Sequence, residues 1–293
     1  MSAERELMRL EARVLASADV AGWLASVDTL RELLHSKPDD VRAAVLRMVV
    51  PKIERRALRA VLAAFALGRD DALAIVGSLD DAAGGALAKR LPSKGATAPV
   101  RGLDAAGRQA LAVAVRIARD RSADPQSMAS PLLGHANRVR GSISDAVNRG
   151  GNEGSTAVAD VAELGTVWIA ETDACVNCLA YSGVIAKPGK SFPGGLTYGR
   201  KSYYPEAIAT PPRHRNCRCV VEPLVAPGFA SALRREADRS VLRGFSLESE
   251  SMAVRVDAAE RLLERGVNAP KSVIAFSRRA VRAGGFPTRG RPQ

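Results

Sequence analysis

Two short stretches, TVWIAETDACVNCLAYSGVIA at 166–186 and PPRHRNCRCVVEPLV at 211–225, contain all four cysteines of the 293-residue chain. The first stretch carries a C-x-x-C pair, and the second carries one of the three histidines, followed by two cysteines. Five side chains of metal-binding type therefore lie within 45 residues, and such clustering is typical of a metal site. They are Cys175, Cys178, His214, Cys217 and Cys219.

The spacing of these residues predicts one structural Zn²⁺ ion. A C-x-x-C pair places two sulfurs on one tight turn, where both can reach a tetrahedral ion at about 2.3 Å. The H-x-x-C pair supplies a second turn, and the 35-residue gap lets the ion clamp two distant segments of the chain. A small, loop-rich and charge-neutral segment has little core of its own, so a metal would stabilise it.

Five candidate ligands compete for four places on such an ion. We expect Cys175, Cys178, His214 and Cys217 to bind, because the two pairs then have the same spacing, and Cys219 to be spare. Binding of both cysteines in C-x-C would need a tighter backbone. The alternative set replaces Cys217 with Cys219.

Three other uses of the cysteines fit the sequence less well. Two disulfides would need an oxidising compartment, which a cytoplasmic chain lacks. A redox C-x-x-C pair normally lies in a βαβ context, which does not surround this one. A cysteine nucleophile with a histidine base needs a third, orienting group, and the sequence suggests none. We therefore favour structural zinc over disulfide, redox or catalytic roles.

The rest of the chain is predicted to be mainly helical. Aromatic residues make up only 4% of it, so the core is built of Ala, Val and Leu, which suits packed helices. Within the first 90 residues, apolar residues recur at helical spacing, and the stretch Ser36–Asp40 marks the end of one helix and the start of the next. Two further helices are expected to end near Leu67 and Leu79. The predicted fold class is α+β, predominantly helical, with a small zinc-stabilised module that contains β-strands. The strand-like segments are 166–170, 183–186 and 219–225.

Composition divides the chain into five parts. Gly- and Pro-containing LPSKGATAPVRG at 91–102 reads as a linker, and NRGGNEGST at 148–156 as a second flexible joint. The final GGFPTRGRPQ is expected to fray. The parts are an N-terminal helical region (1–90), the linker (91–102), a helical segment with helices at 103–121 and about 130–147 (103–164), the zinc module (165–225) and a basic helical C-terminal tail with a flexible end (226–293).

Positive charge is concentrated outside the zinc module. The chain has a net charge of +12, of which +5 lies in 91–150 and +6 in 226–293, whereas 151–225 is neutral. The last 23 residues carry six basic and no acidic side chains. Such segments suit non-specific contacts with the phosphates of double-stranded DNA, and few aromatic residues accompany them for base stacking.

The sequence gives no reason to expect a membrane protein. The N-terminus lacks the order of charged and apolar residues of a signal peptide. The longest uncharged apolar stretch, AVLAAFALG at 60–68, is far shorter than the roughly 18 residues of a spanning helix. We expect the chain to be made in the cytoplasm.

The cysteine-rich region resembles the Mu F-like minor head (head morphogenesis) proteins of tailed bacteriophages. The resemblance covers about 145–225 and implies a non-enzymatic virion protein in the capsid interior or at the portal vertex, assembled in the host cytoplasm. It implies the portal protein, the major capsid or scaffold protein and packaged DNA as partners. In this family the second cysteine of the C-R-C end is often replaced, which supports a spare Cys219. The matching residues are Trp168, Asp173, Cys175, Cys178, Gly183, Pro211, Pro212, His214, Asn216, Cys217 and Arg218.

Two other functions were considered. The run His214-Arg215-Asn216 is similar to a fragment of metal-dependent nucleases, so the alternative function is a zinc-stabilised nuclease acting on DNA. A histidine bound to structural zinc cannot also serve as a general base, which disfavours that reading. A host nucleic-acid-binding regulator would need a docking motif such as a helix-turn-helix, and none is evident.

Overall fold

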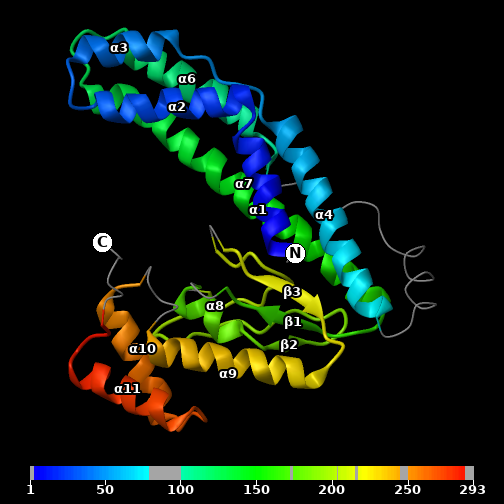
Figure 1. Ribbon diagram of the computed structural model, residues 1–293. Coiled ribbons are helices and arrows are strands. Elements are labelled where there is room, and N and C mark those ends of the chain that lie inside the picture. The colour runs from blue at the N-terminus through cyan, green and yellow to red at the C-terminus, as the bar shows by residue number, and fades with distance from the viewer. Residues whose placement is uncertain are drawn as a thin grey trace. The chain divides into compact units, whose positions relative to one another are not determined.

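The computed structural model describes residues 3–78, 100–171, 174–202, 204–214, 217–244 and 250–287 (Figure 1). The chain forms two compact units, Met1–Leu67 with Lys94–Gly151 and Gly68–Ser93 with Asn152–Gln293. Most of the described residues are helical, and three short strands form one antiparallel sheet. The prediction of a predominantly helical α+β fold is therefore confirmed.

Helices are the regular elements among the described residues of the first unit. Pro38 begins α3 within the predicted break at Ser36–Asp40, with acidic residues in the first turn that favour a helix start. Residues from α2, α3, α6 and α7 share one core, which includes Leu30, Val41, Ala114 and Met128. The helices of this unit are α1 (Ala3–Leu15), α2 (Ala18–Leu33), α3 (Pro38–Arg47), α6 (Leu103–Ala118) and the first parts of α4 (Glu54–Gly77) and α7 (Pro125–Val161).

The expected helix end near Leu67 is wrong, because α4 is continuous from Glu54 to Gly77, which lies close to the other expected end near Leu79. The polar run after Leu67 interrupts the apolar pattern without ending the helix. Ala72 and Val76 continue the buried side of the helix and pack with Val158.

The expected flexible joint at 148–156 is also wrong, because α7 runs through it without a break. The glycines there allow close packing. A Cβ at Gly150 would lie 2.8 Å from the carbonyl oxygen of Val61, and one at Gly151 would lie 2.8 Å from the Leu7 side chain. Glycine in this helix thus provides room for neighbouring helices, at some cost in helix propensity. Most of the predicted linker, residues 91–99, lies outside the described residues.

The second unit contains the sheet, whose strands are β1 (Thr166–Ile169), β2 (Ile185–Ala186) and β3 (Val220–Pro223) in the order β2-β1-β3. The three predicted strand segments contain these strands. Side chains of α7 hydrogen-bond to β3 and its preceding residue. The Asn152 amide accepts from the backbone N–H of Val221 at 2.7 Å and donates to the carbonyl of Cys219 at 3.2 Å. The Ser155 hydroxyl donates to the carbonyl of Val221 at 2.8 Å.

Among its described residues this unit also contains the later parts of α4 and α7 and the helices α8 (Val176–Tyr181), α9 (Pro227–Arg243), α10 (Met252–Glu264) and α11 (Lys271–Arg282) (Figure 1). Of these, α9, α10 and α11 come last in the chain. The last three pack against one another and share a core with α8, which includes Leu179, Val241, Leu262 and Val273. The part of the chain expected as a basic helical tail is therefore folded through α11.

The expected fraying of the final segment is wrong as far as Phe286. This ring is buried against Ala259 and Ala280, so an apolar side chain holds the chain beyond the end of α11. Residues 288–293 lie outside the described residues.

Among the described helices, none has the length and apolar character needed to cross a membrane.

Candidate metal centre

All five predicted ligands come together in the second unit. The donor atoms of Cys175, Cys178 and His214 lie within 4.8 Å of one another, and so do those of Cys178, Cys217 and Cys219. Because Cys178 belongs to both groups, the five side chains form one cluster. The sequence prediction that these residues share a site is supported by this geometry, and the cluster could hold a metal ion.

The first pair of ligands is positioned by the start of α8. Cys175 has extended backbone angles and occupies the N-cap, where its sulfur accepts from the N–H of Cys178 at 3.5 Å. A helix N-cap normally uses an oxygen for this role. The thiol of Cys175 thus lies beside that of Cys178, one helical turn later.

The second pair is positioned by a turn. The backbone N–H of Cys217 donates to the carbonyl of His214 at 3.1 Å, which places both side chains on the same side of the chain. His214 Nε2 lies 2.9 Å from Cys178 Sγ and 3.2 Å from Cys175 Sγ. The sulfurs of Cys178 and Cys217 are 3.7 Å apart. Each turn therefore contributes donors that face the other turn.

An apolar shell excludes water from most of the cluster. Cys178, Cys217 and Cys219 are buried in the same core as Trp168, Tyr181 and Phe192. The Trp168 ring lies 4.9 Å from that of Tyr181 and 5.2 Å from that of Phe192. The sheet and α8 thus provide the thiols with a dry environment, in which an unbalanced charge is costly.

The thiols are crowded enough to share protons. Hydrogen bonding by Cys178 lowers the pKa of Cys175 to about 4 and that of Cys217 to about 2, while it raises the pKa of Cys178 itself. A thiolate held among buried sulfurs is stabilised by a nearby cation. A metal ion at this point would supply that positive charge.

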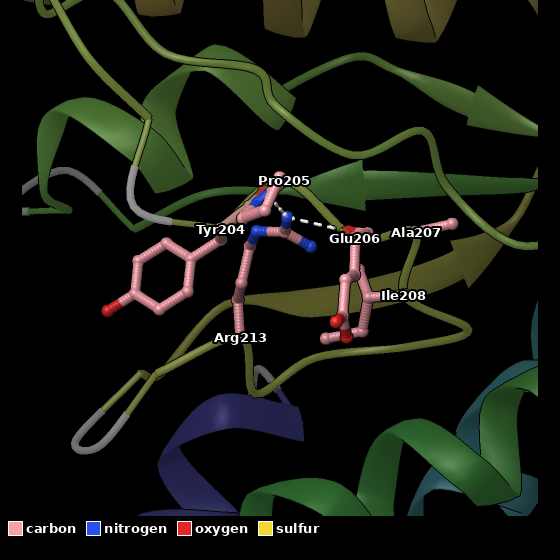
Figure 2. Close-up of a pocket in the computed structure, with 6 residues that line it drawn as sticks. All are labelled: Tyr204, Pro205, Glu206, Ala207, Ile208 and Arg213. Carbon is pink, nitrogen blue, oxygen red and sulfur yellow. Dashed lines mark hydrogen bonds between the residues drawn. The ribbon is translucent and has the colours of Figure 1, made fainter.

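Arg213, next to His214, holds the loop at 204–206 in place through hydrogen bonds, a role that the sequence did not predict. Figure 2 shows its guanidinium against the backbone of Tyr204–Glu206, where it donates to the carbonyls of Tyr204 and Glu206, the latter at 2.8 Å. The guanidinium carbon also lies 4.8 Å from the centre of the Tyr181 ring. These residues adjoin an open cavity of about 380 Å³. The spacing of metal ligands identifies donor residues only, so it does not reveal an arginine that positions a neighbouring loop.

Gly183, the glycine of the motif, is required by geometry. Its φ is +73°, and a Cβ there would lie 2.3 Å from the carbonyl oxygen of Ala230 in α9. Its N–H donates to the carbonyl of Trp168 at 2.8 Å. Glycine thus lets α9 pack closely on the turn that follows α8.

Two other motif residues, Asp173 and Asn216, lie outside the described residues. Of the histidines outside the cluster, His135 is buried in the first unit and its ring centre lies 5.3 Å from that of Trp23, as expected for a core residue.

Comparisons of the chain with protein-family models, with curated proteins and with solved structures found no match.

Proposed function

We propose that this protein is a minor head (head morphogenesis) protein of a tailed bacteriophage, located in the virion at the portal vertex or capsid interior. The observation that carries the proposal is the convergence of the two halves of the motif. The Cys/His ligands come from two separate stretches and meet in one cluster, Trp168 packs in the same core, and the N–H of Gly183 donates to the carbonyl of Trp168. Ligands that meet from both halves of a motif are a stronger basis for a family assignment than C-x-x-C alone.

We further propose that the cluster binds one structural Zn²⁺ ion through Cys175, Cys178, His214 and Cys217. Sulfur and imidazole donors are those that zinc prefers. The 3.7 Å between Cys178 and Cys217 matches the edge of about 3.8 Å expected for a tetrahedron with arms of about 2.3 Å. With four protein ligands, the ion would have no open position for a reacting water, so it would join the two turns without catalysis. Cys219 would be a buried neighbour.

The charge distribution supports different partners for different parts of the chain. The module at 165–225 lies in the neutral part of the sequence, so it suits contact with a protein such as the portal, the major capsid protein or the scaffold. The basic segments at 91–150 and 226–293 suit packaged double-stranded DNA.

The test of the proposed function is the composition of purified particles. An epitope-tagged copy of the chain should co-sediment with tailed virions at low copy number and should be recovered with the portal protein after mild capsid disruption. A soluble marker expressed in the same cells is the control for trapped protein. Absence of the chain from virions, together with normal particle yield from a deletion strain, would overturn the proposal.

A nicking assay tests the nuclease alternative separately. His214 Nε2 faces two sulfurs, a position that suits a ligand more than a free base. We expect supercoiled plasmid to stay intact with Mg²⁺ or Mn²⁺. Nicking that disappears in a folded His214→Ala variant would support the nuclease instead.

A further inference from the structure

The outer side of α11 carries a concentration of positive charge that the folding of the second unit does not use. Lys271, Arg278, Arg279 and Arg282 are all exposed. The sequence contains no acidic residue after Glu264. These four residues are called the α11 basic row below.

Helical geometry aligns three members of this row. Residues seven and eleven positions apart point in nearly the same direction on a helix of 3.6 residues per turn, so Lys271, Arg278 and Arg282 share one face. At 1.5 Å per residue they extend over about 16 Å. That length equals about five phosphate steps of one DNA strand, at about 3.4 Å each.

The opposite face of α11 is fixed by packing. Val273 and Ala280 are buried in the cores that α11 shares with α9 and α10, and Ser277 is fully buried. Phe286 then covers Gly244, where a Cβ would lie 2.5 Å from the ring. The row is thus held on a rigid helix, which lowers the entropy cost of binding.

Two acidic groups of the neighbouring helices, Asp257 and Glu236, have other partners. Asp257 of α10 lies 2.8 Å from Arg200 and 3.0 Å from Arg261, and Glu236 of α9 lies 3.5 Å from Arg239. Within the described ranges, no ion pair includes a member of the α11 basic row. Four charges therefore remain available to an external polyanion.

We propose that the α11 basic row binds the phosphate backbone of double-stranded DNA without reading its sequence. A straight row of cations on a rigid helix complements regularly spaced phosphates. A membrane surface fits less well, because three of the large apolar side chains of α11, Val273, Phe276 and Val281, pack against the cores of the unit and are not free to insert. The inference rests on the proposed function only for the choice of DNA as the polyanion.

The size of the expected effect follows from counterion release. Each phosphate contact contributes about 0.9 to the slope of log affinity against log salt. The triple variant Lys271→Gln, Arg278→Gln, Arg282→Gln should therefore reduce that slope by about 2.7. If the DNA affinities of the variant and the unchanged protein are equal at about 1 M salt, the variant should bind roughly 500-fold more weakly at about 0.1 M salt.

The experiment measures binding of the full-length, metal-loaded chain to two labelled duplexes of unrelated sequence, by fluorescence anisotropy at roughly 50–200 mM salt. A matched control removes the same net charge through Arg31→Gln, Arg69→Gln and Arg239→Gln. Each of these arginines is already paired with an acidic residue, at 3.7, 2.7 and 3.5 Å respectively. Circular dichroism and metal content confirm that both variants are folded.

We expect equal affinity for the two duplexes, a strongly reduced slope for the α11 variant and a change of less than about one unit for the control. Equal losses in both variants would show a net-charge effect and overturn the proposal. The proposal would also be overturned if the α11 variant kept its DNA affinity but lost binding to phosphatidylserine vesicles, because that result would identify a membrane surface as the partner. Failure of the DNA-binding experiment does not affect the virion test of the proposed function. Conversely, if the chain binds DNA through α11 but is absent from virions, only the proposed function is refuted.

Discussion

The substitution Asn152→Ala tests the arrangement that joins α7 to the sheet. Asn152 is 2% exposed, and its amide satisfies the N–H of Val221 and the carbonyl of Cys219. Each buried group left without a partner costs about 1–3 kcal/mol. Alanine regains at most about 0.7 kcal/mol through its higher helix propensity. We therefore expect the free energy of unfolding of the second unit to fall by about 1–5 kcal/mol.

The assay uses the two tryptophans of the chain, of which Trp23 lies in the first unit and Trp168 in the second. In a Trp23→Phe background, urea unfolding followed by fluorescence reports on the surroundings of Trp168 alone. Ser231→Ala, an exposed change in α9 of the same unit, controls for helix propensity. If Asn152→Ala costs no more than this control, the two hydrogen bonds do not stabilise the sheet and the reasoning is refuted.

Three further predictions concern the metal, the glycine turn and pH. Cys175→Ser should lose about one zinc per chain and make the module protease-sensitive, whereas Cys219→Ser should keep its zinc by metal analysis; the reverse pattern would exclude our ligand set. Gly183→Ala should lower the unfolding free energy by about 2–5 kcal/mol in urea titrations, since it adds a left-handed alanine to a close backbone approach; a loss below about 1 kcal/mol would contradict this clash. Burial lowers the pKa of His135, and the nearby positive charge of Arg138 lowers it further. Below about pH 6.5 the unfolded chain therefore binds more protons at this residue than the folded chain does, so the free energy of unfolding should fall as the pH drops past that value. Unfolding followed by Trp23 fluorescence should show a smaller loss in His135→Leu, and equal losses would exclude the histidine as the cause.

Much of the candidate metal site could be predicted from the sequence, because ligand spacing is a local property. Two residues between Cys175 and Cys178 define one tight turn wherever the chain places it, and the same holds for His214 and Cys217. The strand segments were also predictable from runs of β-branched and aromatic residues. What the sequence left open is which cysteine is spare, since all of them lie in one cluster.

The wrong expectations share one cause: they assigned a local meaning to residues that act through distant partners. Gly150 and Gly151 look like a joint until Val61 and Leu7 are placed against them. Phe286, near the C-terminus, looks like part of a frayed end until its core contacts are known. Composition reports how freely a segment could move, but only tertiary contacts decide whether it does.

The hydrogen bonds from α7 to β3 have a consequence for association between copies of the chain. An exposed strand edge is a template for adding a strand from another molecule, which leads to aggregation. Here Asn152 and Ser155 occupy backbone groups of Val221 on β3, and the opposite strand, β2, has only two residues. Within the part of the chain that the structure describes, the sheet therefore offers few free backbone groups for the addition of a strand from a neighbouring molecule.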